Sequence, residues 1–349
     1  MGKGSVPVHY MEAAFMKWGI LSTGMIARKF AEAVKKSETG TLAAVGSRSF
    51  GTANAFAKEF EVPKAYPTYD GVLSDPTVEA VYIAPPHPMH CEWTVAAAKA
   101  GKHILCEKPL GMNREEAGTM VGAARRANVV LMEAFMYRCH PQTRRLVELV
   151  REGTLGEMRM IRASFCFDRD LGPEHRLFNK ALGGGGILDL GCYPVSMSRL
   201  LVGAAHGKLF EEPSEVKGSA HFGTTGVDEW ASAVLKFPGD IVAEVSCATR
   251  VDREPGFLRL YGTEGQLTVP SPWHATQEPG ETIIYLQDKE GRREQAVRVR
   301  AEKSLYAYEA DLFARAVEKG FPEPPAMTPE DSLGNAETLD RWLASAKNE

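Results

Sequence analysis

The amino-acid sequence predicts an α/β protein with two domains: an N-terminal doubly wound parallel sheet and a C-terminal α+β domain with a large, mostly antiparallel, open sheet. Two observations lead to this prediction. In the first part of the chain, short apolar stretches alternate with amphipathic segments, which favours parallel strands joined by right-handed crossovers. After about residue 150, stretches of alternating apolar and polar residues follow one another between turns rich in glycine and proline, as in antiparallel sheets.

The N-terminal elements follow from their local patterns. The first strand begins near Lys17 and leads through a Ser-Thr-Gly turn into a helix, in which Ile26, Phe30 and Val34 recur at helical spacing. Gly101 suits the position that ends a helix. Further strands are expected at residues 41–49, 80–84, 103–110 and 129–135, and further helices at 51–62, from about 69, at 91–102 and at 113–128.

The C-terminal domain is expected to contain several strands, a helix between them, and two closing helices. We assign residues 17–136 to the first domain and 137–328 to the second, and we expect the last helix to pack back on the first domain. The strand-like segments are residues 157–168, 214–223, 228–239, 240–250, 256–269 and 281–288, and the helices are near 188–203, 305–317 and 329–346.

Composition excludes several classes of protein. A net charge of −4 argues against binding to nucleic acid or to anionic membranes, and no segment has the length and apolarity of a membrane span. The six cysteines form no C-x-x-C pair and mostly lie in apolar stretches, which indicates reduced thiols and a cytoplasmic location. The histidines and cysteines show no metal-binding spacing, so no metal site is predicted. The first 16 residues lack a signal-peptide core and are expected to be a loose extension.

The turn after the first strand fits a dinucleotide-binding fingerprint. The frame G-x-G-x-x-G/A matches residues 22–27, STGMIA, with Ser22 in place of the first glycine. Gly24 would let the backbone approach a pyrophosphate, and the helix N-terminus would bind its phosphates. This pattern and its position predict a Rossmann domain. The residues expected to contact the cofactor here are Ser22, Thr23, Gly24, Met25 and Ile26.

The end of the second strand indicates which nicotinamide cofactor is used. NAD enzymes usually place an aspartate or glutamate there to bind the ribose 2′-hydroxyl, whereas this chain has Gly46-Ser47-Arg48-Ser49. Arg48 can pair with a 2′-phosphate and Ser47 can donate a hydrogen bond to it. We therefore predict NADP in preference to NAD, the alternative for Arg48 being a solvated loop residue.

A charged pair follows a later apolar strand. The apolar residues 104–106 lead directly into Glu107, Lys108 and Pro109, and the proline prevents further strand pairing. The glutamate and lysine are thus placed at a strand's carboxyl end, where open α/β sheets bind their ligands. An exposed ion pair in a loop is the alternative interpretation.

The ordered segments STGMIA, VYIAPPHPMH, GKHILCEKPL, EAFMYRCHP and GGGGILDLGCYPV resemble the glucose–fructose oxidoreductase/inositol dehydrogenase (Gfo/Idh/MocA) family. The resemblance covers essentially the whole chain from Lys17. Its most specific part is E-K-P followed about eighty residues later by D-x-G-x-[HY], here Asp189 and Tyr193. Tyrosine in place of the commoner histidine resembles the dimeric dihydrodiol dehydrogenase and D-xylose dehydrogenase branch.

The resemblance implies a catalytic group of three residues. Lys108 would contact cofactor and substrate, with Asp189 and Tyr193 facing it from the second domain. Oxidation of an alcohol needs a proton acceptor, and a free phenol with a pKa of about 10 is a poor base at neutral pH. We expect the Lys108 ammonium to lower that pKa, with Tyr193 as general acid/base, Lys108 as electrostatic partner and Asp189 as the orienting group. The roles of Tyr193 and Lys108 can also be exchanged.

Further residues are secondary candidates for the site. Arg176 and Asn179 are candidates for the substrate pocket, and residues 183–186, four glycines, would permit close backbone approach. His90 either lines the cleft or caps the next helix, and Trp230 and Trp273 are interpreted as core or interface residues. Glu133 and Arg138 lie where the family approaches the nicotinamide, although an arginine bonded to neighbouring loops is an equal alternative. The cofactor contacts expected beyond the first turn are Ser47, Arg48, Ala84, Pro85, His87, Glu107, Lys108 and Arg138.

The leading functional hypothesis is an NADP-dependent oxidoreductase acting on a secondary hydroxyl, or the matching carbonyl, of a sugar, anhydrosugar or cyclic diol. A non-catalytic regulator that binds NADP and a sugar is the alternative from another class. Redox-assisted glycoside hydrolysis with a tightly held NAD is disfavoured by Arg48 and Tyr193. The branch also implies a homodimer or higher homo-oligomer formed through the exposed sheet face.

Overall fold

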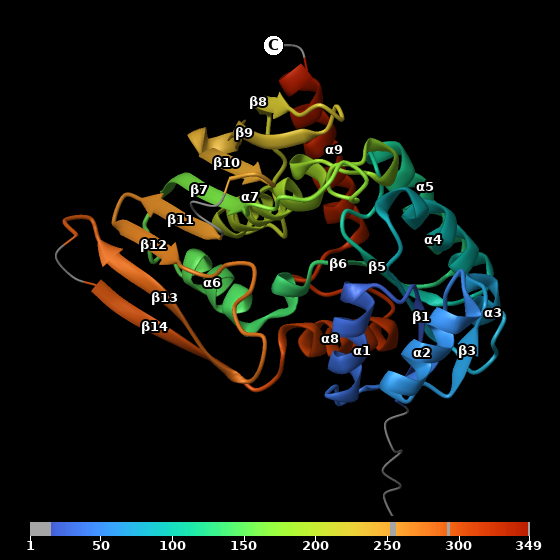
Figure 1. Cartoon of the computed structure of the whole chain (residues 1–349). Helices are drawn as coiled ribbons and strands as arrows, with labels where there is room; N and C mark the ends of the chain where they lie inside the picture. The colour runs from blue at the N-terminus through green and yellow to red at the C-terminus, as the bar shows by residue number, and fades with distance from the viewer. Residues whose placement is uncertain (1–14, 252–255, 292–293, 348–349) are drawn as a thin grey trace, which may run out of the picture.

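The computed structural model describes residues 15–251, 256–291 and 294–347, so most of the expected N-terminal extension lies outside the described residues. Figure 1 shows two lobes, with the N-terminal strands and helices in one and a large sheet in the other. Both predicted sheets are present, which confirms the fold class. No helix within the described residues combines the length and apolarity needed to cross a membrane.

The N-terminal sheet has six parallel strands in the order β3-β2-β1-β4-β5-β6. Strands β1 to β3 are added toward one edge of the sheet and β4 to β6 toward the other, so the strand order reverses between β1 and β4. The carboxyl ends of these two strands flank the crevice where such sheets bind ligands. β3 was not predicted, because three residues are too few to show a period. The strands are β1 (Met16–Leu21), β2 (Gly40–Gly46), β3 (Lys64–Tyr66), β4 (Ala80–Ile83), β5 (His103–Glu107) and β6 (Leu131–Ala134).

Two apolar cores cover the two faces of this sheet. Successive strand residues alternate between them: Tyr82 belongs to the core under α1, whereas Val81 and Ile83 belong to the core under α4 and α5. Alternation of side chains along a strand explains this division. The helices are α1 (Met25–Lys35), α2 (Phe50–Phe60), α3 (Tyr69–Leu73), α4 (His90–Lys99) and α5 (Arg114–Ala127).

Two C-terminal helices connect the lobes. α8 (Leu305–Lys319) lies within the range assigned to the second domain, yet it packs on α1, and its Phe313 ring lies 5.0 Å from the ring of Trp18 on β1. α9 (Pro329–Lys347) contacts α5 and β6 of the first lobe and α7 and β8 of the second. The division near residue 136 remains a prediction, because packing of α8 and α9 crosses it.

The second sheet has eight strands in the order β14-β13-β12-β11-β7-β10-β9-β8, and every pair except β7–β10 is antiparallel. β14 was not predicted, because only two strongly apolar residues, Val297 and Val299, mark the alternation in it. The strands are β7 (Met158–Cys166), β8 (Glu215–Phe222), β9 (Asp228–Lys236), β10 (Val242–Ala248), β11 (Phe257–Gly262), β12 (Gly265–Val269), β13 (Gly280–Asp288) and β14 (Glu294–Ala301).

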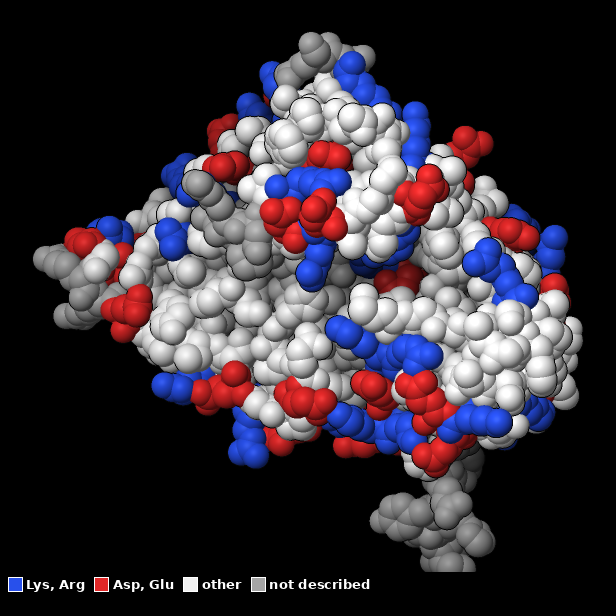
Figure 2. Space-filling model, viewed as in Figure 1, with Lys and Arg blue, Asp and Glu red and all other residues white. Residues whose placement is uncertain are grey.

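Helices α6 (Pro141–Arg151) and α7 (Cys192–Ala205) cover one face of this sheet. A π-helical turn, η4 (Ile187–Gly191), leads into α7. On the opposite face, Trp230 and Val234 of β9 are 41% and 47% exposed, as expected for an open sheet. Figure 2 shows positive and negative side chains interspersed on the viewed surface rather than gathered by sign.

Candidate active site

A cleft of about 350 Å³ lies at the carboxyl ends of β1, β4 and β5. Residues from the second lobe complete it, so it lies between the two sheets. Among the described residues, no group of three or more histidine, cysteine, aspartate or glutamate side chains is placed to hold a metal ion. The cleft is lined by Ser22, Gly24, Met25, Ile26, Ala84, Pro85, Pro86, His87, His90, Glu107, Lys108, Met136, Arg176, Asp189, Tyr193, His274 and Tyr306.

The turn after β1 has the features of a phosphate site. Ser22 has a φ of 110°, in the region that glycine adopts most readily, so the serine takes the conformation of the missing first glycine. Gly24 precedes α1 without a side-chain cap, and the first turn of α1 contains no acidic residue. The helix amides and dipole therefore remain available to an anion, which fits a dinucleotide pyrophosphate. Thr23 lies in this turn but does not line the cleft.

Ser47 and Arg48 follow β2, outside the cleft itself. Arg48 is exposed and forms no ion pair or side-chain hydrogen bond with the residues that the structure describes. The Ser47 hydroxyl is 2.6 Å from that of Thr52. Arg48 lies near Tyr69, whose side chain also bonds to Ser22, so it is close to the nucleotide turn. An exposed guanidinium at this place fits a 2′-phosphate.

Lys108 and Asp189, 81 residues apart in sequence, meet in the cleft. The Lys108 ammonium donates to the carbonyl oxygen of Asp189 at 2.8 Å and to its Oδ1 at 3.0 Å. Arg176 Nη1 donates to the same Oδ1 at 3.2 Å, and His87 Nε2 lies 3.7 Å from it. The structure thus places Lys108, Asp189 and Arg176 together.

The charges in this group stabilise one another. Burial alone would raise the pKa of Asp189, but Lys108 and Arg176 hold that pKa below its ordinary value. Burial would lower the pKa of Lys108, but Asp189 raises it. At neutral pH the cleft therefore contains an ammonium group fixed by a carboxylate.

Tyr193 lines the cleft from the first turn of α7, one helical turn after Asp189. The Lys108 ammonium is 5.1 Å from the centre of its ring, and the phenol oxygen is 3.7 Å from the sulfur of Met136. The ring packs against Phe165 and Trp273, at centroid distances of 5.0 and 5.7 Å.

The expectation that Lys108 lowers the pKa of Tyr193 is wrong for this structure. Burial raises that pKa well above its ordinary value, and the nearby Tyr306 and Cys192 add to the effect. The ammonium lies over the ring and bonds to Asp189, so it does not offset the cost of burying a phenolate. Tyr193 therefore keeps its proton at neutral pH.

Two histidines fix the loops around the lysine. His87 Nδ1 is 3.1 Å from the carbonyl oxygen of Gly183, and burial lowers the pKa of His87 to about 3. His90 begins α4 but does not cap it, since its ring nitrogens lie 2.9 and 3.0 Å from the carbonyl oxygens of Pro109 and Pro85. It thereby joins the segments that follow β4 and β5.

The glycines at 183–186 approach other segments closely, as expected. Gly183 has a φ of 74°, and a Cβ there would lie 2.9 Å from the Cβ of His87. A side chain would thus separate the carbonyl of Gly183 from the His87 ring.

Arg138 does not contact the cleft, contrary to the cofactor role assigned to it. It is 1% exposed, and its guanidinium bonds to Ser196 and to the carboxylate of Asp331 at the start of α9. A buried arginine needs a buried anion, and Asp331 supplies it. Asn179 is also displaced from its expected place, because its side chain accepts from the amide of Ala181 and caps a short 3₁₀ turn.

Four cleft residues were not predicted: Pro86, Met136, His274 and Tyr306. Pro86 and Met136 belong to the segments VYIAPPHPMH and EAFMYRCHP that the sequence singled out, but no local signal marks the other two. His274 lies between β12 and β13, and Tyr306 is in the first turn of α8. Trp273, beside His274, is a core residue whose indole donates to the carbonyl of Ser164 at 2.8 Å.

Glu133 lies beneath the lysine loop rather than in the cleft. Its Oε1 accepts from the amide of Leu110 at 2.8 Å, and burial raises its pKa to about 7 from the ordinary 4.5. The unfolded chain loses this proton at lower pH, so the stability contributed by Glu133 falls between about pH 4.5 and 7.

The difference in free energy of unfolding between Glu133→Gln and wild type should therefore change in favour of the variant as the pH rises from 5 to 8, by at most about 3 kcal/mol. Urea unfolding at both pH values measures the difference. Glu318→Gln on the exposed face of α8 is the control and should follow wild type at both. An equal wild-type-to-variant difference at pH 5 and pH 8 would contradict the assignment.

Comparison with known proteins agrees with this geometry. Residues 16–135 match a family model described as an oxidoreductase family with an NAD-binding Rossmann fold, and residues 143–268 match the GFO/IDH/MocA C-terminal domain. The trans-1,2-dihydrobenzene-1,2-diol dehydrogenase of Mus musculus is 33% identical, over 93% of this chain and 95% of that protein. The D-xylose 1-dehydrogenase (NADP(+)) 2 of Haloferax volcanii is 32% identical, over 95% and 98%.

A solved structure has the same architecture. KijD10, a 3-ketoreductase from Actinomadura kijaniata in complex with TDP-benzene and NADP, superimposes with a TM-score of 0.82. The sequences are 25% identical, and the match covers 95% of this chain and 98% of that one.

Proposed function

The chain belongs to the GFO/IDH/MocA family of oxidoreductases and is an NAD(P)-dependent dehydrogenase or reductase; on that premise we propose that it uses NADP to interconvert a secondary hydroxyl and carbonyl of a sugar, anhydrosugar or cyclic diol. The contact between Lys108 and Asp189 carries this proposal, because it joins the nucleotide lobe to the second lobe at the carboxyl end of β5. A cleft with apolar walls at Ile26 and Met136 and a charged cluster at one end suits a small cyclic polyol.

In the proposed reaction, four residues of the cleft have distinct roles. The cofactor supplies or accepts the hydride. Lys108 donates hydrogen bonds to the reacting oxygen and stabilises negative charge on it, while Asp189 fixes the direction of the ammonium. Tyr193, which keeps its proton, donates to that oxygen when a carbonyl is reduced. Arg176, 46% exposed at its side chain, contacts other polar groups of the substrate.

Absorbance at the nicotinamide band tests the proposal, with NADP and a panel of aldoses, anhydrosugars and cyclic diols. Turnover on at least one of these classes is expected. NADP binding without turnover on any of them would instead support the regulatory protein. We also propose a cytoplasmic location, in accordance with six cysteines that form no disulfide in the structure.

Arg48→Ala should weaken NADP binding by about 10- to 100-fold while leaving NAD binding nearly unchanged. The reason is the loss of a charge-assisted hydrogen bond to the 2′-phosphate. Fluorescence titration with both cofactors measures the effect, with Arg126→Ala on the exposed side of α5 as the control. An unchanged preference for the 2′-phosphate would remove Arg48 from this role.

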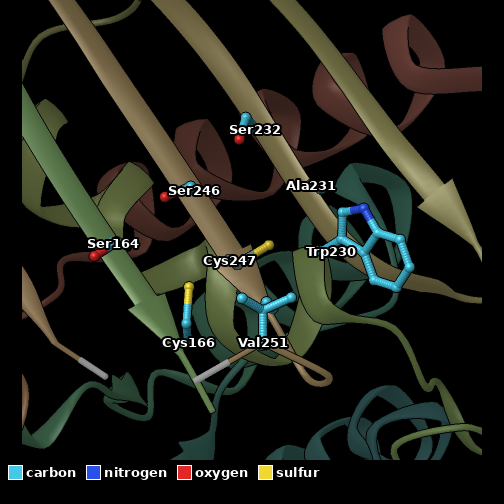
Figure 3. Close-up of a pocket in the computed structure, with 9 residues that line it drawn as sticks. Ser164, Cys166, Trp230, Ala231, Ser232, Ser246, Cys247 and Val251 are labelled. Carbon is cyan, nitrogen blue, oxygen red and sulfur yellow. The ribbon is translucent and has the colours of Figure 1, made fainter. Parts of the chain in front are cut away.

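We further propose that the open sheet face forms a homodimer. Figure 3 shows this face, where Ser164, Ser246 and Ser232 occupy adjacent strands and Trp230 lies beside them. A shallow cavity of about 550 Å³ lies here, and Trp230 and Val251 are 41% and 39% exposed. Small side chains allow two sheets to approach closely, and exposed tryptophan is typical of interface centres.

Trp230→Arg should weaken dimerisation at least tenfold, because it places a charge at the centre of the proposed interface. Sedimentation velocity across a range of micromolar concentrations measures this. Leu209→Arg, at an exposed apolar residue after α7, is the control and should leave the association unchanged. A wild-type protein that is monomeric at these concentrations would contradict the proposal.

A further inference from the structure

Glu107 presents a buried carboxylate at the wall of the cleft. The residue is 8% exposed and immediately precedes Lys108. The Tyr82 hydroxyl donates to its Oε1, and the backbone amide of Lys108 donates to its Oε2 at 3.2 Å. Both donors are neutral, and none of the cationic side chains in the described ranges forms an ion pair with Glu107. The carboxylate is held in place, but its charge has no direct partner.

The nearest cations are bonded elsewhere. Lys108 directs its ammonium to Asp189, at 2.8 Å from the carbonyl oxygen and 3.0 Å from Oδ1, and Arg176 bonds to the same carboxylate. Their charges still act on Glu107, but burial outweighs them and raises its pKa. The negative charge of the buried Glu107 carboxylate is therefore only partly compensated. A positively charged group bound in the cleft would stabilise it further.

The protein interior behind Glu107 offers no positive charge. Glu309 of α8 is fully buried, and neither of its carboxyl oxygens has a hydrogen-bond partner among the described residues. Burial raises the pKa of Glu309 well above its ordinary value, which favours the protonated form of this side chain. Tyr82 is stacked on Phe30 with ring centroids 3.9 Å apart, which makes the remaining surroundings apolar. Any compensating charge must come from the cleft.

We propose that the Glu107 carboxylate distinguishes the two oxidation states of the bound nicotinamide, binding the oxidised cofactor more tightly than the reduced one. The inference rests on the proposed function and on the expectation that the nicotinamide binds in the cleft beside Glu107 and Lys108. The oxidised ring carries a positive charge that is lost when it accepts a hydride, so a buried carboxylate nearby interacts favourably with only one state. Glu107 would then lower the reduction potential of the bound cofactor and favour reduction of the carbonyl substrate.

The test compares dissociation constants for NADP⁺ and NADPH by fluorescence and competition titration, without turnover. Glu107→Gln keeps the size of the side chain and an acceptor for Tyr82. In this variant the ratio of the NADPH to the NADP⁺ dissociation constant should fall by about tenfold or more. Tenfold corresponds to about 30 mV for a two-electron couple.

Three further variants test whether the charge that distinguishes the two cofactor states belongs to Glu107. Tyr82→Phe removes a donor that stabilises the carboxylate, so its ratio should fall in the same direction but less. Glu309→Gln changes a buried acid that does not line the cleft and should leave the ratio unchanged, as should the exposed control Glu318→Gln on the same helix.

An unchanged ratio in Glu107→Gln, with both cofactors still bound, would overturn the inference. An equally large fall in Glu309→Gln would also overturn it, because the charge would then not belong to Glu107. If the chain binds NAD in place of NADP, the same comparison applies to NAD⁺ and NADH. A chain that binds none of these cofactors would refute the proposed function, and this inference with it.

Discussion

Lys108→Met should lower kcat by about 10²- to 10⁴-fold, with a much smaller effect on cofactor affinity. The substitution removes the ammonium group that lies between Asp189 and the ring of Tyr193. The pKa of Lys108 is raised, so this positive charge is present throughout the working range of pH and stabilises negative charge on the reacting oxygen. Steady-state kinetics with a substrate identified by the panel measures the loss.

Two further variants show whether the loss is chemical or structural. Lys108→Arg keeps a positive charge for the buried Asp189 and should fold like wild type, yet a planar guanidinium cannot direct its donors as an ammonium does. Its kcat should remain at least tenfold below wild type. Lys99→Met on the exposed side of α4 should be fully active. A Lys108→Met enzyme with wild-type kcat would exclude a catalytic role for the lysine.

Tyr193→Phe should also lower kcat by about 10²- to 10⁴-fold, because it removes the proposed proton donor and leaves the ring packing intact. Tyr285→Phe on β13 is the control, since Tyr285 lies outside the cleft. Rapid mixing with single turnover separates the chemical step from release of product.

The raised pKa of Tyr193 also predicts how rate depends on pH. Reduction of a carbonyl uses the phenol in its stable, protonated form and should vary little between pH 6 and pH 8. Oxidation of the alcohol needs the phenolate, whose fraction rises about tenfold per pH unit below the pKa, so its rate should still be rising at pH 9. An oxidation rate that levels off near pH 7 would assign the acid/base role to another group.

Much of the fold was predictable because it depends on local patterns. Apolar strands and amphipathic helices alternate visibly through residue 135, and parallel strands joined in this way place their carboxyl ends at one edge. The position of Glu107 and Lys108 in the cleft follows from that edge alone. β3 and β14 were missed because one is too short and the other has too few strongly apolar residues for the period to show.

Two of the assignments that failed concern buried polar groups. Arg138 carries no local mark that distinguishes a cofactor contact from an internal ion pair, and its partner Asp331 is 193 residues further along the chain. Tyr193 also carries no local mark of its raised pKa. That pKa results from burial of the ring against Phe165, which is on β7, and Trp273, which is in a later loop. Neither environment could be constructed before the lobes were packed.

The amino-acid sequence by itself determined most of the strands and helices, where the nucleotide turn lies, and which charged residues end a strand, because each depends on neighbours a few positions away. Only the tertiary structure decided that Arg176 shares the carboxylate of Asp189 with Lys108, that Tyr193 keeps its proton, and that α8 packs on α1. Those outcomes depend on burial and on distances between segments far apart in the chain, and both are set when the two sheets and the last two helices come together.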